Sequence, residues 1–286
     1  MKSKFLYALI NSLFLLSGIL CFCGFLQDFS VSFFSTNYFI LLISFAGVIY
    51  LLKAFRLYFL FAGNGIELFK FLKVYSKTTF VNIMLPFKIG EIFRFYCFGN
   101  LTKNYMKGLL IILLERFIDI FSIFIVVFVS ILFGEKYGGN LLKFLFVIEF
   151  ILLFFYLIIP GMVDYWKNYF IKSNSSKRHY TALVFVENLK IVFKEINILA
   201  KGRFVPILLI SIVTWSLEFL LLVLTNKFFI NSSEKQISDY LNSTLLGNSF
   251  PLLNNFLIIS AFIMILSFLS VSFIQFVKNI GDKNGK

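Results

Sequence analysis

The sequence predicts an all-α integral membrane protein with six full transmembrane helices, one re-entrant helical hairpin and both termini in the cytoplasm. The chain is 59% hydrophobic and 14% charged, whereas a soluble domain is about 45–50% apolar and about 25% charged. The apolar residues fall in blocks of about 20 or more, the length that a helix needs to cross a bilayer. Basic residues gather at alternate ends of these blocks, which fixes the expected orientation.

Six apolar blocks are expected to cross the membrane fully. The first block resembles a secretory signal, but it is too long for a signal core and no small-x-small cleavage site follows it, so we expect it to remain as a span. The blocks cover residues 5–26, 38–62, 106–133, 141–160, 204–228 and 251–277.

A seventh block, residues 80–100, differs from the others because a proline, a glycine and three charged side chains interrupt its middle. Such a segment cannot face lipid along its whole length. If it crossed the membrane, the most basic loop of the chain would be placed outside, against the positive-inside rule. We therefore expect a re-entrant hairpin that returns to the cytoplasmic side, with Pro86 and Gly90 as its hinge.

The sequence as a whole predicts a single transmembrane domain over residues 1–286, with a basic cytoplasmic loop over residues 161–203. Within this loop, Thr181–Ala200 shows apolar residues at helical spacing with lysines between them. This pattern is typical of an amphipathic helix that lies on an anionic membrane surface. The net charge of +13 comes from the loops. We find no internal repeat, and a soluble catalytic domain has no room.

Charged side chains at membrane depth are costly, and they are kept mainly where they face a bundle interior or a wet cavity. Here acidic and basic side chains are equal in number, which favours mutual pairing because an unpaired buried charge is strongly destabilising. Around Glu91 and around Glu115 the charges recur at i, i+3 or i, i+4, so each group shares one helix face. The intramembrane charges are Lys53, Arg56, Lys88, Arg94, Arg116, Glu91, Glu115, Asp119, Glu149 and Glu218.

The chain has too few histidine and cysteine residues for a metal site or for catalysis by a histidine or a cysteine. The single histidine, His179, lies in a polar stretch, and Cys21, Cys23 and Cys97 lie inside apolar blocks. None of them belongs to a spaced set of metal ligands, and a histidine base would have no partner. We therefore expect no metal, no cofactor, no catalytic residue and no nucleic-acid partner, and an enzymatic activity is less favoured than a transport role.

The polar residues of the hairpin and of later spans form a pattern. Asn82, Leu85, Pro86, Lys88, Gly90, Glu91 and Arg94 lie in the hairpin, Glu115, Arg116 and Asp119 in the next span, and Arg56, Ser211, Trp215 and Glu218 in two other spans. This pattern, over roughly residues 50 to 230, resembles the flippase-like transmembrane region of lysylphosphatidylglycerol synthases. It is also similar to archaeal membrane proteins of dolichol-linked glycan assembly.

The resemblance implies the translocating half of such a synthase. The family usually has a glycine-rich turn with a glutamate before its last helices, and residues 246–251 keep at most a remnant of it. The soluble aminoacyl-transferase domain of full synthases is not expected in this chain. The resemblance therefore does not imply aminoacyl transfer from tRNA.

The leading hypothesis is that the protein moves or handles a phospholipid or glycolipid with a charged headgroup across the plasma membrane of a prokaryote. Broken helices with charged flanks at mid-membrane are a common way to build transport sites. Basic side chains would receive an anionic phosphate, and acidic side chains would receive a cationic group or balance the arginines. The expected headgroup cavity contains Arg56, Asn82, Lys88, Glu91, Arg94, Glu115, Arg116, Asp119 and Glu218.

Two alternatives stay open. In the first, the protein is an accessory or assembly protein of surface glycan or lipid biosynthesis, with a second copy or a biosynthetic protein as partner, and the buried charges only hold helices together. In the second, it is a membrane glycosyltransferase that uses a lipid-phosphate sugar donor. That reaction needs a carboxylate base at the membrane surface, and Asp28 is the one acidic residue of the first external loop.

Overall fold

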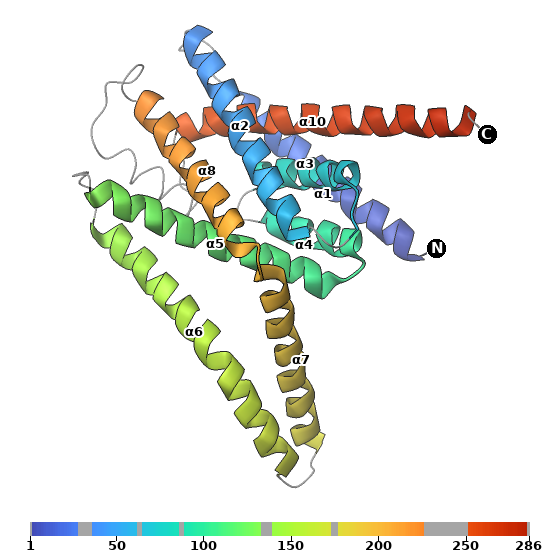
Figure 1. Cartoon of the computed structure of the whole chain (residues 1–286). Helices are drawn as coiled ribbons and strands as arrows, with labels where there is room; N and C mark the ends of the chain where they lie inside the picture. The colour runs from blue at the N-terminus through green and yellow to red at the C-terminus, as the bar shows by residue number, and fades with distance from the viewer. Residues whose placement is uncertain are drawn as a thin grey trace. The chain divides into compact units, whose positions relative to one another are not determined.

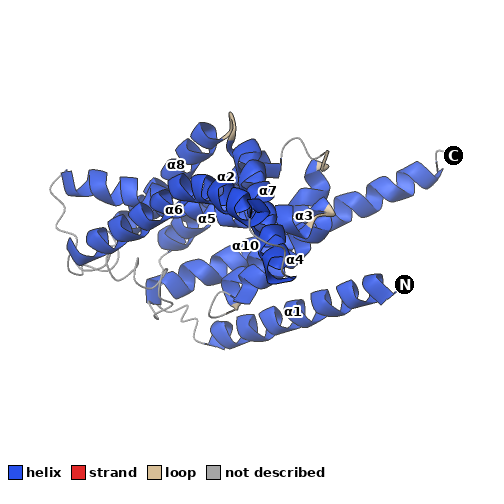
Figure 2. Ribbon diagram, turned by 90° about the horizontal axis from the view of Figure 1, so that it is seen from below, coloured by secondary structure: helices blue, strands red, loops and turns tan. Residues whose placement is uncertain are grey.

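The structure, a computed structural model, describes residues 2–27, 36–61, 65–85, 89–132, 139–172, 177–225 and 251–284. These residues are helical apart from short connections, and no strand occurs among them (Figures 1 and 2). The all-α prediction is therefore confirmed. In chain order the helices are α1 (Lys2–Gln27), α2 (Thr36–Phe61), α3 (Leu68–Met84), α4 (Ile89–Thr102), α5 (Tyr105–Leu132), α6 (Gly139–Lys172), α7 (Lys177–Ala200), α8 (Phe204–Thr225) and α10 (Pro251–Asn284).

Four segments of the described residues are long and apolar enough to cross a membrane: Phe5–Leu26, Thr36–Phe61, Phe204–Thr225 and Asn255–Lys278. They coincide with four of the six predicted spans. The other two predicted spans correspond to α5 and α6, which have 28 and 34 residues. Their crossing of the membrane stays a prediction, as does the cytoplasmic position of both termini.

The predicted hairpin corresponds to α3 and α4, which pack against each other and are joined through residues 85–88. Its first arm begins at Leu68, earlier than the predicted start at residue 80. Three lysines weaken the apolar signal of this part, although lysine is a good helix former. Pro86 and Lys88 lie outside the described residues, and entry of the hairpin into a membrane stays a prediction.

Gly90 lets the two arms of the hairpin approach closely. A Cβ atom at this position would lie 2.8 Å from Oδ1 of Asn82 and 2.9 Å from its backbone nitrogen, which is closer than non-bonded atoms approach. Gly90 is buried at the start of α4. The glycine is therefore required for contact between the arms, whether or not it also acts as the predicted hinge.

The chain divides into two compact units. The first contains Met1–Gly108 and Val213–Lys286. Within it α3 packs against α1, α4 and α10, and α2 also packs against α10. The hydroxyl groups of Ser76 on α3 and Ser267 on α10 are 2.9 Å apart. The interior is rich in aromatic rings, among them the pair Phe61 and Phe98 with centroids 5.0 Å apart.

The second unit, Leu109–Ile212, is built around the pair of helices α6 and α7. Helix α6 passes through Pro160 and continues to Lys172, into the range predicted as a loop. Helix α7 covers the segment Thr181–Ala200, and the amphipathic character of this helix stays a prediction. Polar contacts between the described side chains of the two helices include Lys167 Nζ to Glu187 Oε1 at 2.8 Å, Lys190 Nζ to Asp164 Oδ1 at 2.7 Å, and Tyr156 Oη to Asn197 Oδ1 at 2.7 Å. The position of α7 on a membrane surface stays a prediction.

Candidate functional site

An ion pair joins α2 and α8 within the first unit. Lys53 Nζ donates to Glu218 Oε1 at 2.6 Å, across a sequence separation of 165 residues. The side chain of Glu218 is 4% exposed and that of Lys53 is 24% exposed. Both residues lie in apolar segments of membrane length. Sequence reasoning identified each as an intramembrane charge, but it did not place Lys53 at the headgroup site or pair the two.

Two aromatic rings also lie close to the Lys53 ammonium. Its nitrogen lies 5.3 Å from the ring centroid of Tyr50 and 5.7 Å from that of Trp215, both within the distance of about 6 Å at which a cation is attracted to a ring face. Tyr50 precedes Lys53 by one turn and Trp215 precedes Glu218 by one turn. Sequence reasoning missed Tyr50, although its i, i+3 spacing to Lys53 was visible.

Arg56 follows Lys53 by one turn of α2 and is 1% exposed. It belongs to a buried stripe of this helix that also contains Leu42, Ile49 and Leu60. Because a guanidinium group is not deprotonated in proteins, this position keeps a positive charge inside the unit. Arg56 is therefore a second cation on the α2 face that carries Lys53, and its position at membrane depth stays a prediction.

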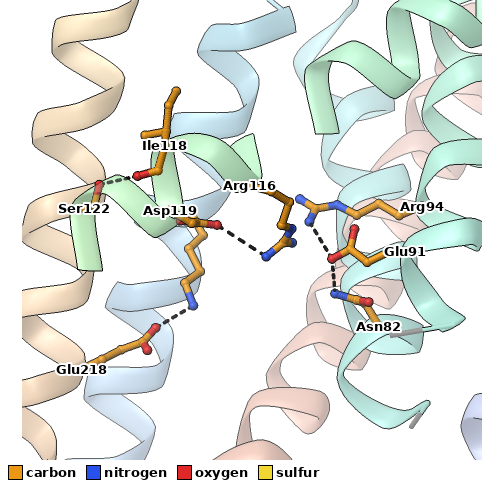
Figure 3. A network of polar contacts seen from close by, with 9 residues as sticks. Asn82, Glu91, Arg94, Arg116, Ile118, Asp119, Ser122 and Glu218 are labelled. Carbon is orange, nitrogen blue, oxygen red and sulfur yellow. Dashed lines mark hydrogen bonds and ion pairs between the residues drawn. The ribbon is translucent and has the colours of Figure 1, made fainter. Parts of the chain in front are cut away.

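The hairpin holds a second polar cluster (Figure 3). Asn82 Nδ2 on α3 donates to Glu91 Oε1 on α4 at 3.0 Å, and the same oxygen lies 3.9 Å from Arg94 Nη1. The side chain of Arg94 is 5% exposed and that of Glu91 is 21% exposed. The Arg94 guanidinium also lies 5.7 Å from the ring centroid of Phe98. One carboxylate therefore links the two arms and orients a buried arginine.

A third cluster ties α1 to the hairpin, and sequence reasoning missed it. Lys77 Nζ donates to Asn11 Oδ1 at 2.5 Å and lies 5.6 and 5.4 Å from the ring centroids of Tyr7 and Phe93. Cys97 Sγ lies 3.6 Å from the same oxygen of Asn11. The polar Asn11 inside an apolar block was the signal that could have revealed the contact.

In the second unit, α5 carries the other predicted charges. Arg116 Nη1 lies 3.5 Å from Asp119 Oδ2, which agrees with the i, i+3 reach expected from the sequence. Glu115 is 3% and Asp119 is 7% exposed. The Ser122 hydroxyl donates a hydrogen bond to the backbone carbonyl oxygen of Ile118 at 2.7 Å, one turn earlier on the same helix (Figure 3).

The predicted site residues that the structure describes are thus divided between the two units. No set of histidine, cysteine or acidic side chains that could hold a metal occurs among the described residues. A single cavity that contains every predicted residue stays a prediction. The first unit contains Arg56, Asn82, Glu91, Arg94 and Glu218, and the second contains Glu115, Arg116 and Asp119. Asp28, Pro86, Lys88, residues 246–250 and the side chains of Glu149 and His179 lie outside the description.

Comparison with known proteins agrees with the resemblance in the polar pattern. The sequence model of one family, described as the lysylphosphatidylglycerol synthase TM region, matches residues 9–230. The match covers most of the chain and ends before α10 begins. No curated protein and no solved structure matches. Four apolar segments of membrane length and the family match together indicate a multi-pass membrane protein. The chain belongs to the family of the lysylphosphatidylglycerol synthase TM region.

Proposed function

We propose that this protein translocates or handles a lipid with a charged headgroup across the cell membrane. The observation that carries the proposal is the burial of charges of both signs on apolar or polar-interrupted helices of a membrane protein. Arg56, Arg94 and Glu218 are 1%, 4% and 3% exposed. The name of the family refers to the membrane region of a phospholipid synthase, which supports a function that concerns membrane lipids.

The physical demand of such transport matches these side chains. A charged headgroup that enters the hydrocarbon layer loses its water, and each charge then needs a partner. An arginine guanidinium binds a phosphate through two parallel hydrogen bonds. A carboxylate accepts hydrogen bonds from an ammonium or a hydroxyl group. Acyl chains need no such partners, because they remain in lipid.

The hairpin cluster is suited to receive the phosphate. The distance of 3.9 Å between Arg94 Nη1 and Glu91 Oε1 is longer than the roughly 2.7–2.9 Å of a strong charge-assisted hydrogen bond. Asn82 holds the carboxylate from the other arm at 3.0 Å. At this distance Glu91 does not engage the guanidinium tightly, so a phosphate that binds Arg94 would not have to break a close ion pair between Arg94 and Glu91.

The test uses liposomes that contain the purified protein and a trace of phosphatidylglycerol, lysylphosphatidylglycerol or phosphatidylethanolamine with a fluorescent label on one acyl chain, which leaves the headgroup unchanged. Dithionite bleaches label in the outer leaflet, so loss of label from the inner leaflet reports translocation. We expect wild type to move at least one of these lipids, and Arg94→Ala and Glu91→Gln to move none of them. Equal translocation by wild type and both variants, or no translocation by wild type, would contradict the proposal.

A matched control is available on the surface of the hairpin. Lys70 and Glu67 also form an i, i+3 pair, with a distance of 3.2 Å, but their side chains are 61% and 66% exposed. Lys70→Ala and Glu67→Gln should translocate lipid as wild type does. Recovery of each variant in the liposomes shows whether it inserts, so a loss of transport is not confused with a loss of protein.

A structural role has one specific observation in its favour, since Lys53 and Glu218 form a close ion pair with each other. If the buried charges only join helices in an assembly protein, the exchange Lys53→Glu with Glu218→Lys should restore what either single change removes. The exchange Glu91→Arg with Arg94→Glu should do the same for the hairpin. A headgroup site should not tolerate either exchange, because the signs presented to the ligand are reversed.

A further inference from the structure

We infer that Glu218, Trp215 and Tyr50 form a binding site for the primary ammonium of a lipid headgroup, and that this ammonium binds by displacing the ammonium of Lys53. The inference rests on the proposed function and specifies its substrate class as headgroups that carry both a phosphate and a primary amine.

The chemistry of the site is that of ammonium recognition. The carboxylate of Glu218 accepts the Lys53 N–H at 2.6 Å, and the faces of Tyr50 and Trp215 lie 5.3 and 5.7 Å from the nitrogen. An anionic acceptor with two ring faces binds a cation through a charge-assisted hydrogen bond and cation–π attraction. Nothing in this set recognises the carbon chain of lysine, so the ammonium of another molecule fits the same groups.

The difference in burial indicates how exchange can occur. Glu218 is 4% exposed at its side chain, whereas Lys53 is 24% exposed. The acceptor is therefore buried within the unit, and the donor is the more exposed of the two partners. Lysine has a flexible stem of four carbons, so its ammonium can leave by side-chain rotation without displacement of α2 or α8.

Charge balance selects the class of headgroup. A headgroup with one phosphate and one primary ammonium can replace the single ion pair with two: its ammonium binds Glu218, and its phosphate binds the released Lys53. Arg56, one turn along α2, keeps this face positive. A headgroup without a cation would take Lys53 away from Glu218 and supply no positive charge in its place, which is unfavourable for a buried carboxylate. A choline headgroup has a cation but no N–H to donate, so it should bind less tightly.

The first experiment detects binding at the site by the fluorescence of Trp215. The chain has two tryptophans, so Trp166→Phe leaves Trp215 as the single indole. In this background, detergent-solubilised protein is titrated with dihexanoyl phosphatidylethanolamine, phosphatidylcholine and phosphatidylglycerol. We expect a saturable fluorescence change with a dissociation constant about tenfold lower for the ethanolamine lipid than for the other two, the factor equivalent to one good hydrogen bond. Equal responses to all three lipids, or none, would overturn the inference.

The second experiment removes the resident ammonium. Lys53→Met relieves internal competition, so ethylammonium chloride should change Trp215 fluorescence saturably at about tenfold lower concentration than in the parent protein. The double variant Lys53→Met with Glu218→Gln should not respond, and sodium chloride controls for ionic strength. Identical responses of the single and double variants would overturn the inference. If Lys53→Met does not insert into the membrane, the lipid titration still tests the inference, because the Trp166→Phe protein used there keeps both Lys53 and Glu218.

O-phosphoethanolamine tests whether the ligand is a lipid or a soluble amine, because it has the phosphate and the amine of the ethanolamine headgroup but no acyl chains. Binding as tight as that of the ethanolamine lipid would overturn the lipid assignment. The translocation assay is independent of these titrations. Translocation without amine-selective binding rejects this inference and leaves the proposed function standing, whereas amine-selective binding without translocation rejects the proposed function and leaves the ammonium site.

Discussion

One ion pair of the first unit and one ion pair between α6 and α7 have nearly the same length but different surroundings. Lys53 and Glu218 are 2.6 Å apart with side chains 24% and 4% exposed. Lys190 and Asp164 are 2.7 Å apart with side chains 54% and 61% exposed. Distance alone therefore does not rank the two pairs. Burial does, because an exposed pair is screened by water, whereas loss of one partner from a buried pair leaves an uncompensated charge.

The largest effect should follow from removing one member of the buried pair. Glu218→Gln should lower the free energy of unfolding by about 3–5 kcal/mol, because Lys53 loses its counter-ion inside the unit. The double variant Lys53→Met with Glu218→Leu should recover most of this loss, since no charge remains. Denaturant unfolding in detergent measures both. A loss for Glu218→Gln no larger than that for Asp164→Asn on the exposed pair would show that burial does not separate them.

The next largest effect should come from the close approach of the hairpin arms. Gly90→Val would place its Cβ against the Asn82 backbone, so we expect a loss of about 1–3 kcal/mol in unfolding free energy from overpacking and loss of lipid translocation. Gly47→Val is the matched control, because no atom lies within 4 Å of a Cβ there. Unchanged translocation by Gly90→Val would mean that contact between the arms is not needed.

A smaller effect is expected for Asn82→Ala, which removes the hydrogen bond to Glu91 across the hairpin. A hydrogen bond to a charged group contributes about 1.5–3 kcal/mol, and partial exposure of Glu91 places the expected loss near the lower end. Translocation should slow without being abolished, because both charged members of the cluster, Glu91 and Arg94, remain. The exposed Asn188 provides the control change Asn188→Ala. Equal results for the two variants would remove Asn82 from the site.

The smallest effect concerns the exposed pair of Lys167 and Glu187. A hydrogen bond from Lys167, with its charge, lowers the pKa of the Glu187 carboxyl. Because the folded pKa is the lower one, the contribution to stability is present above the unfolded pKa and is lost as pH falls through the folded pKa. Lys167→Ala should raise the pKa of Glu187 towards its usual value. Carboxyl NMR titration of wild type and variant measures this, and an unchanged pKa would exclude Lys167 as the cause.

The sequence predicted local features well and distant contacts poorly. The apolar blocks located the helices because a membrane span has a fixed minimum length, and the i, i+3 spacing predicted the contact of Arg116 with Asp119. The pairing of Lys53 with Glu218 could not be read from spacing, since it depends on how α2 and α8 pack. The early start of α3 was missed because its lysines interrupt the apolar signal.

The C-terminal helix shows a further limit of reading motifs alone. Helix α10 lies beyond the residues that the family matches, and no motif in it was predicted to matter. It nevertheless packs against α3 and α2, and Lys73 Nζ donates to its Gln275 Oε1 at 3.3 Å. The first arm of the hairpin is therefore supported by a helix outside the matched pattern.

The central claim, that the buried charges receive a lipid headgroup, is tested most directly by mass spectrometry of the lipids retained by purified protein. Wild type, Arg94→Ala and the control Lys70→Ala are compared at matched detergent concentration. We predict that one lipid species with a charged headgroup is enriched in wild type and Lys70→Ala and is lost in Arg94→Ala. The same bulk phospholipids in all three proteins, with no enriched species, would contradict the claim and favour a structural role for these charges.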